Sequence, residues 1–161
     1  DFFTPTKTTS LQSVLPYLKD AAKTIWVHNS FTSESDIKAV QATNTDAYWC
    51  LCPNANQYIE NTMPPVQLLR EQHANIVVGT DSYASNWSLN MLDELKRIQL
   101  HNSQIPLAEM LTWITSNGAR ALQMDDKLGS IEIGKKPGLV LIENLLDQHQ
   151  ITNSISAKRI L

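Results

Sequence analysis

The chain has 161 residues, of which 42% are hydrophobic and 18% are charged, and its formal net charge is −3. These values are ordinary for a globular protein and allow one domain with a sizeable core. The charge gives no electrostatic reason to expect a nucleic acid or an anionic membrane as a partner. No apolar run approaches the roughly 20 residues that a membrane-spanning helix needs, so we expect no membrane segment.

The first residue bears on whether the chain is a fragment, and the two cysteines bear on its cellular compartment. The chain opens on Asp1 rather than on Met, which predicts a fragment or a processed chain, and its opening residues do not resemble a signal peptide. Cys50 and Cys52 are too close together to cross-link a fold, so they do not indicate an oxidising compartment. The expected location is the cytoplasm.

The first half of the chain predicts helices alternating with strands. Ser10 is expected to cap a first helix, and residues 24–28 form a β-branched and aromatic run that predicts a strand. Ser33 and Asp36 have the spacing of a capping box, which predicts a second helix. Residues 47–52 predict the next strand.

The following segments repeat this alternation. Residues 53–56 are expected to end the second strand, and residues 66–73 to form a short helix. A third β-branched run, residues 76–78, leads into Gly79, which lets the backbone turn or approach a ligand closely. Alternating β and α units imply a parallel sheet, so the predicted fold class is α/β.

Helices and then a β appendix are expected after the third strand. Met91, Leu95 and Ile98 lie on one face of an amphipathic helix whose exposed side carries an Asp93–Arg97 pair. The next helix opens at a proline, and its continuation is expected to be interrupted at residues 117–118.

The end of the chain predicts strands. Residues 129–134 and 139–142 flank a Lys-Lys-Pro-Gly turn and predict a β-hairpin, and residues 151–161 could supply one more strand.

Polar residues follow each of the three predicted strands: His28, then Asn54 and Asn56, then Asp81. Because the carboxyl ends of parallel strands share one edge of the sheet, we expect these residues along one rim. Asp81 can be a metal ligand, a general base or a helix cap. His28 can be a site residue or a histidine satisfied by the backbone, and the two asparagines can serve a turn, so the residues alone leave these alternatives open.

Several motifs in this order resemble the second half of an amidohydrolase-superfamily barrel. They are WVHNS around His28, CPNAN at residues 52–56, GTDS around Asp81 and LGSIEIGKK at residues 128–136. The resemblance is to the branch that holds cytosine, guanine and adenosine-type deaminases and triazine hydrolases. It implies the C-terminal part of a TIM-like (β/α)8 barrel, about strands six to eight with helices, in residues 1–127, and strands of a small β-sandwich domain in residues 128–161.

The same resemblance implies the chemistry of the parent protein. That protein would be a metal-dependent amidohydrolase that hydrolyses a C–N bond with metal-activated water, deaminating a nucleobase-like or other cyclic amine or amidine. The metal would be Zn²⁺ or Fe²⁺, and Asp81 would be both a metal ligand and a catalytic proton acceptor. His28 would be the second catalytic residue and would orient the hydroxide or the tetrahedral intermediate by hydrogen bonding.

The family's other metal ligands have no match here. The chain contains no His-x-His pair, and only Asp81 corresponds to a ligand of the family. A barrel of this type needs about 250 residues, so the resemblance implies a C-terminal fragment that is inactive alone and holds no metal tightly. Open strand edges predict association with the missing N-terminal half or with a second copy, as in a homo-oligomer.

A different class of function is a self-standing α/β module that binds a small ligand at the turn from Gly79 to Asp81 without catalysis. The chain has no Gly-x-Gly-x-x-Gly or Walker motif to support nucleotide binding. Ser82 lacks the Gly-x-Ser-x-Gly context of a serine hydrolase. An upstream reading frame through a His-x-His strand would favour the hydrolase.

Other metal-binding residue types have simpler interpretations. A Cys-x-Cys pair is weak evidence for metal, and Cys50 and Cys52 fit small buried residues of a barrel layer. The remaining histidines, His73, His101 and His149, are expected at the surface.

Overall fold

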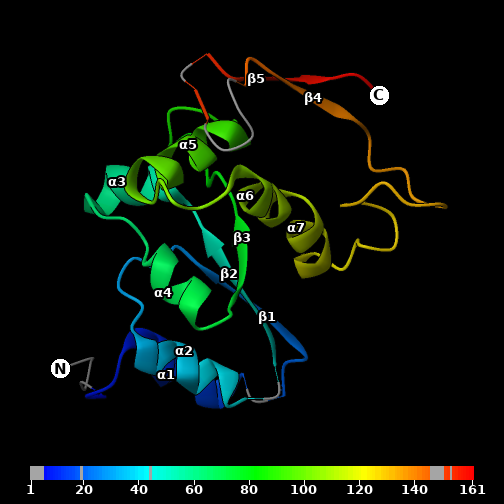
Figure 1. The fold of residues 1–161 in the computed structure, drawn as a ribbon. Coiled ribbons are helices and arrows are strands. Elements are labelled where there is room, and N and C mark those ends of the chain that lie inside the picture. Colours follow the sequence, from blue (N-terminus) through cyan, green and yellow to red (C-terminus); the bar gives the residue numbers. More distant parts are fainter. Residues whose placement is uncertain (1–5, 19, 44, 146–150, 153) are drawn as a thin grey trace.

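The computed structural model describes residues 6–18, 20–43, 45–145, 151–152 and 154–161. Its centre is a three-stranded parallel sheet in the order β1 (Lys23–Val27), β2 (Asp46–Leu51) and β3 (Asn75–Val78), seen in Figure 1. All three strands lie on the β-branched and aromatic runs that predict them. Their pairing confirms the parallel sheet that the alternating units predict.

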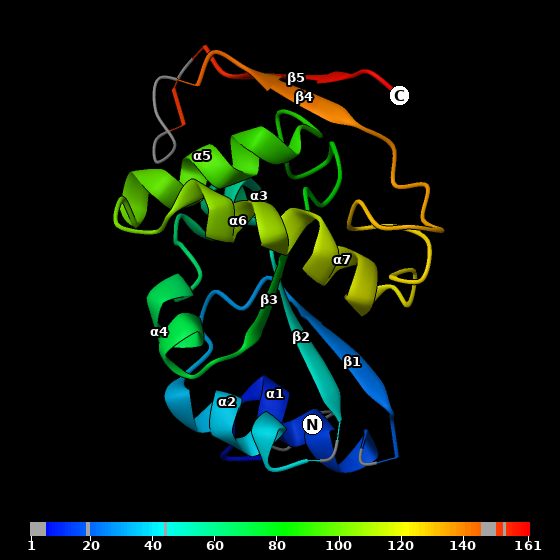
Figure 2. The same cartoon turned by 45° about the vertical axis from the view of Figure 1, so that its right-hand side comes forward.

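Helices precede, connect and follow the three strands (Figure 2). They are α1 (Ser10–Val14) with the 3-10 helix η1 (Leu15–Tyr17), α2 (Glu34–Gln41), α3 (Pro53–Glu60), α4 (Val66–Glu71), α5 (Met91–His101), α6 (Leu107–Ile114) and α7 (Ser116–Ala121). Along the chain, α2 lies between β1 and β2, and α3 and α4 lie between β2 and β3. The predicted capping box of α2 is present, since Ser33 and Asp36 exchange side-chain and backbone hydrogen bonds. None of the helices among the described residues has the length and apolarity that crossing a bilayer requires.

One face of the sheet carries the main core. Trp49, Leu51, Ile76 and Val78 are buried there with apolar residues of α2, α4, α5 and α6. Alternate residues of a strand point to opposite faces, so these side chains all lie on the helix-covered face. Burial of this face is the main source of stability of the layer.

The opposite face is only partly covered. Tyr48 and Val77 pack against Ala121 of α7. Ile25 and Val27 of β1, which point to the same face, are 41% and 51% exposed. An apolar sheet face left open in this way is a surface on which another polypeptide segment can pack.

The end of the chain forms a separate two-stranded antiparallel sheet, β4 (Val140–Glu143) with β5 (Ser156–Arg159). It lies beside α5 in both views (Figures 1 and 2). The strand predicted within residues 151–161 is confirmed, but the hairpin of residues 129–134 with 139–142 is wrong. Gly129 and Gly134 have φ of 86° and 92°, a backbone conformation that interrupts a strand, and residues 129–134 form no strand.

Two segments expected as interruptions are helical. Residues 53–56 form the first turn of α3, where the missing N–H of Pro53 breaks no helical hydrogen bond. Asn117 and Gly118 lie inside α7, and Asn117 Nδ2 donates to the carbonyl of Ile76 at 2.9 Å. Contacts with the sheet therefore outweigh the weak helix propensity of an Asn-Gly pair.

Candidate active site

The carboxyl ends of the parallel strands bring His28 and Asp81 together. His28 directly follows β1, Asp81 follows β3 after Gly79 and Thr80, and Nε2 of His28 lies 3.9 Å from Oδ2 of Asp81. The two side chains are 41% and 32% exposed, so a small molecule can reach them. Their shared rim is the arrangement that a parallel sheet predicts from the sequence.

The backbone at this rim has an uncommon conformation. His28, Asn29 and Asp81 have φ of 72°, 62° and 58°, in the left-handed region that residues other than glycine rarely adopt. Asn29 is buried, and its side-chain amide donates to the carbonyls of Trp26 and Cys50 at 2.8 and 3.2 Å. Such conformations persist where the surrounding contacts hold them, and they are found preferentially at functional sites.

Asn56 orients the ring of His28. Its Nδ2 donates to the carbonyl of His28 at 2.9 Å and to Oγ of Ser30 at 2.7 Å, which leaves Oδ1 as the acceptor facing Nδ1 of His28 at 3.1 Å. Nδ1 therefore carries a proton. In the neutral imidazole the free lone pair then lies on Nε2, the atom that faces Asp81.

Two residues that the sequence did not single out also meet this loop. Oγ of Ser85 donates to Oδ2 of Asp81 at 2.5 Å. Glu94 of α5 is fully buried, and burial raises the pKa of its carboxyl group. The sequence carries one indication of this burial. Glu94 lies three residues after Met91, on the apolar face of the helix, where a carboxylate needs buried hydrogen-bond partners.

Asn54, whose role the sequence left open, is one of those partners. Its backbone N–H and its side-chain Nδ2 donate to the Glu94 carboxylate at 3.0 and 2.9 Å, and its Oδ1 accepts from Nε of Arg97 at 3.0 Å. Arg97 is thus turned toward Asn54, while Asp93 forms its ion pair with Lys96 at 3.1 Å. The Asp93–Arg97 pair expected from helical spacing is replaced by these two contacts.

The cysteines explain the glycine at the end of β3. A Cβ atom on Gly79 would lie 3.2 Å from Sγ of Cys50 and 3.7 Å from Sγ of Cys52. Gly79 therefore serves a close approach of the backbone to these sulfurs. The pKa of the Cys52 thiol is raised by its hydrogen bond with Cys50 and by burial, which keeps it protonated and unreactive.

Asp81 and His28 are the side chains at this rim whose chemistry could bind a metal. A carboxylate and an imidazole are donors that zinc accepts, and Asp81 stands exposed at the rim. Among the described residues, however, no group of three or more His, Cys, Asp and Glu side chains gathers to hold an ion. The described residues therefore do not make a complete metal site by themselves. His73 and His101 are exposed as predicted, and His149 lies outside the described residues.

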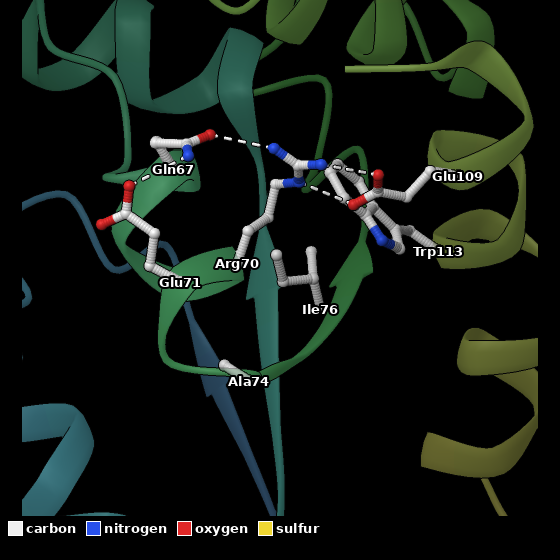
Figure 3. A pocket seen from close by; sticks show the side chains of 7 residues that line it. All are labelled: Gln67, Arg70, Glu71, Ala74, Ile76, Glu109 and Trp113. Carbon is white, nitrogen blue, oxygen red and sulfur yellow. Dashed lines mark hydrogen bonds and ion pairs between the residues drawn. The ribbon is translucent and has the colours of Figure 1, made fainter. Parts of the chain in front are cut away.

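The cavity in Figure 3 is lined by neither His28 nor Asp81. It has a volume of about 330 Å³ and is lined by residues of α4, β3 and α6 and by Ala74, which precedes β3. Within it, Arg70 donates through Nε and Nη2 to Glu109 at 2.6 and 2.8 Å, and through Nη1 to Gln67 at 2.9 Å. The guanidinium of Arg70 is therefore already paired with Glu109, and this ion pair links α4 to α6 within the cavity.

Comparison with known proteins shows the family of the chain. A model of the amidohydrolase family matches residues 4–159. The chain belongs to this family. The amidohydrolase chain is 33% identical over 138 residues to a 5-methylthioadenosine/S-adenosylhomocysteine deaminase from Teredinibacter turnerae, which is 81% of this chain and 31% of that protein.

Solved structures lead to the same group of proteins. An adenosine deaminase from Xanthomonas campestris with bound zinc matches with a TM-score of 0.65 and 29% identity, over 74% of this chain and 28% of that one. The aminofutalosine deaminase of Helicobacter pylori in complex with methylthio-coformycin matches with a TM-score of 0.61 and 32% identity, over 71% of this chain and 28% of that one. The amidohydrolase chain therefore spans about a third of the length of the relatives that it matches.

Proposed function

We propose that this chain is the part of a metal-dependent deaminase that carries Asp81 and His28. In this proposal β1, β2 and β3 are about the sixth to eighth strands of a (β/α)8 barrel within residues 1–127, and residues 128–161 belong to a small β-sandwich domain. The 3.9 Å approach of His28 Nε2 to Asp81 Oδ2 at the carboxyl edge of a parallel sheet is the observation that carries it.

The substrate class follows from the relatives. Proteins named as deaminases of adenosine, of 5-methylthioadenosine and S-adenosylhomocysteine, and of aminofutalosine all match this chain. The complete enzyme accordingly hydrolyses the bond between a ring carbon and the exocyclic amine of an adenine-type nucleoside, releasing ammonia. The substrate of the complete enzyme is therefore a small molecule.

A Zn²⁺ or Fe²⁺ ion, when bound, supplies Lewis-acid activation of water near neutral pH. In this chain Asp81 would be the ligand. The described residues bring no further group of ligands to it, so the other ligands are supplied by the rest of the parent enzyme.

The residues of the chain divide the proton transfers between them. Asp81 accepts a proton from the attacking water and passes it to the amine, which leaves as ammonia while the water oxygen bonds to the ring carbon. His28 directs its Nδ1–H to Asn56, so the lone pair of its Nε2 faces Asp81. Through this lone pair His28 accepts a hydrogen bond from the attacking water and orients it. Asn56 thus determines which nitrogen faces the reaction.

The test measures ammonia release by the intact protein from adenosine, 5′-methylthioadenosine and S-adenosylhomocysteine. Asp81→Ala is expected to abolish turnover and to lower bound zinc. His28→Ala is expected to lower kcat by about 10²–10⁴, the usual worth of a positioned proton-transfer group, with zinc retained. His101→Ala, an exposed histidine on α5, is the matched control. Normal activity in either Asp81→Ala or His28→Ala would falsify the assignment.

A further inference from the structure

A buried hydrogen-bond network lies behind Asp81, and the proposed proton transfers do not use it. Its centre is Glu94, which has 0% exposure. Oε1 of Glu94 accepts from Nδ2 of Asn54 at 2.9 Å and from Nδ2 of Asn86 at 2.6 Å, and Oε2 accepts from the backbone N–H of Asn54 at 3.0 Å. A carboxylate buried to this extent is tolerated only because its acceptor positions are filled.

Asn86 connects this carboxylate to the backbone next to Asp81. Its Nδ2 donates at 2.6 Å to the carbonyl of Thr80 and at 2.6 Å to Glu94, so each of its two N–H bonds has an acceptor. Its Oδ1 accepts from the backbone N–H of Ser88 at 3.2 Å, which fixes the orientation of the amide. The carbonyl held by Asn86 belongs to the peptide unit that begins Asp81.

Asp81 depends on support of this kind. Its φ of 58° is unfavourable for a residue with a Cβ, and residues 81–84 of its loop are exposed. A left-handed residue in an exposed loop keeps one conformation only where surrounding contacts impose it. The Asn86–Thr80 hydrogen bond is such a contact, and Glu94 anchors it in the core.

The network reaches the helix that also orients His28. Asn54 and Asn56 both lie in the first turn of α3; Asn54 binds Glu94, and Asn56 binds His28. Arg97, one turn along α5 from Glu94, holds the other end of the Asn54 amide at 3.0 Å. The first turn of α3 therefore helps to position both His28, through Asn56, and Asp81, through Asn54 and Glu94.

We propose that Asn86 and Glu94 are positioning residues for Asp81. Neither touches the reacting atoms; they set the place and direction of the Asp81 carboxylate through the Thr80 carbonyl. The proposal rests on the proposed function, since it takes Asp81 as metal ligand and proton carrier. Residues that orient a ligand from behind typically change metal affinity or activity 10–100-fold when they are mutated.

The experiment uses the intact zinc-loaded protein and the variants Asn86→Ala, Glu94→Gln and Asp81→Ala. The matched control is Asn117→Ala, which also removes a side-chain amide from a backbone carbonyl, in this case that of Ile76 within β3, at a distance from the rim. Three quantities are measured: amide hydrogen exchange of residues 80–85, the zinc dissociation constant, and kcat and KM with 5′-methylthioadenosine as probe.

Asn86→Ala and Glu94→Gln are expected to exchange faster in residues 80–85, including the Ser85 amide that donates to Ser82. We expect zinc affinity and kcat to fall about 10–100-fold, with a smaller change in KM, because a ligand and proton carrier is displaced while substrate contacts remain. Asn117→Ala should match the wild type in all three quantities. If Asn86→Ala does not fold, Asn86→Asp, which keeps the size and removes the donors, is measured with Glu94→Gln.

The outcomes separate this inference from the proposed function. Zinc and turnover retained in Asp81→Ala overturn the function itself. Loss in Asp81→Ala with wild-type zinc affinity and kcat in both network variants overturns the positioning role alone, whether or not the loop exchanges faster. Equal losses in Asn117→Ala also overturn it, since the effect would then be general destabilisation.

Discussion

The residues at the strand ends are packed closely enough that a single methyl group matters. A Cβ on Gly79 would meet Sγ of Cys50 at 3.2 Å, closer than most Cβ contacts in proteins, so the sulfur would have to shift to accommodate it. At Gly118 in α7, by contrast, the nearest atom to an added Cβ is the carbonyl oxygen of Trp113 at 3.8 Å. Gly79 therefore allows close packing at the rim, whereas no steric reason requires a glycine at position 118.

Gly79→Ala is expected to destabilise the intact protein by about 1–3 kcal/mol, the usual cost of overpacking. Adding Cys50→Ala should recover part of that loss, because it removes the sulfur that the new methyl group meets. Gly118→Ala, the control, should be neutral or should stabilise by about 0.5–1 kcal/mol through helix propensity. Urea unfolding measures all three. A fully tolerated Gly79→Ala would contradict the packing explanation.

At the scale of elements, the start of α2 ties the first helix to the rest of the fold. Burial alone would raise the pKa of Asp36, but hydrogen bonds from Thr9 and Ser33 lower it below its ordinary value. Thr9 is the N-cap of α1, so the expected cap at Ser10 is wrong by one residue, and Ser33 is the N-cap of α2. One carboxylate therefore joins two helix starts. A carboxyl group whose pKa is lower in the folded state stabilises the fold where it is ionised.

Asp36→Asn is therefore expected to lose about 1–2 kcal/mol at pH 7, on the scale of a lost cap. The wild-type advantage should be full above the ordinary carboxyl pKa near 4 and should disappear as the pH falls through the lowered pKa of Asp36. Thermal melting of both proteins between pH 7 and pH 2.5 measures the difference. Asp126→Asn, at an exposed pair with Lys127, should leave the profile unchanged. A constant gap at every pH would show that the effect is not linked to ionisation.

At the scale of the whole molecule, two features support the proposal that this chain is one part of a larger enzyme. Ile25 and Val27 leave one sheet face open, and the described residues gather no group of three metal ligands around Asp81. Catalytic zinc sites usually have three protein ligands, and open sheet faces and edges tend to find partners.

We predict that the 161-residue chain alone is inactive, binds no zinc stoichiometrically and associates with a second copy, and that co-expression with the rest of the parent protein restores zinc and turnover. Val27→Lys should weaken self-association by placing a charge on the open face. Light scattering of the purified chain and of this variant measures the association, and metal analysis of the purified chain measures bound zinc. A monomer with stoichiometric zinc and deaminase activity would mean that the active site is built within this chain.

Local patterning was sufficient for the α/β alternation, the parallel sheet, the capping box at Ser33 and the rim that holds His28 and Asp81. Periodicity and capping act over a few residues, and parallel pairing follows from the order of the elements. The catalytic and metal-binding roles of His28 and Asp81 came from the family resemblance and stay predictions.

Only the tertiary structure decided which groups hold that rim in place. Glu94 meets Asn54 across 40 positions of sequence, and Asn56 meets His28 across 28. β4 pairs with β5 rather than with the segment before it, and residues 53–56 start a helix. Such choices depend on which distant chain segments can bury a carboxylate or complete a strand pair, and spacing along the sequence carries no information about either.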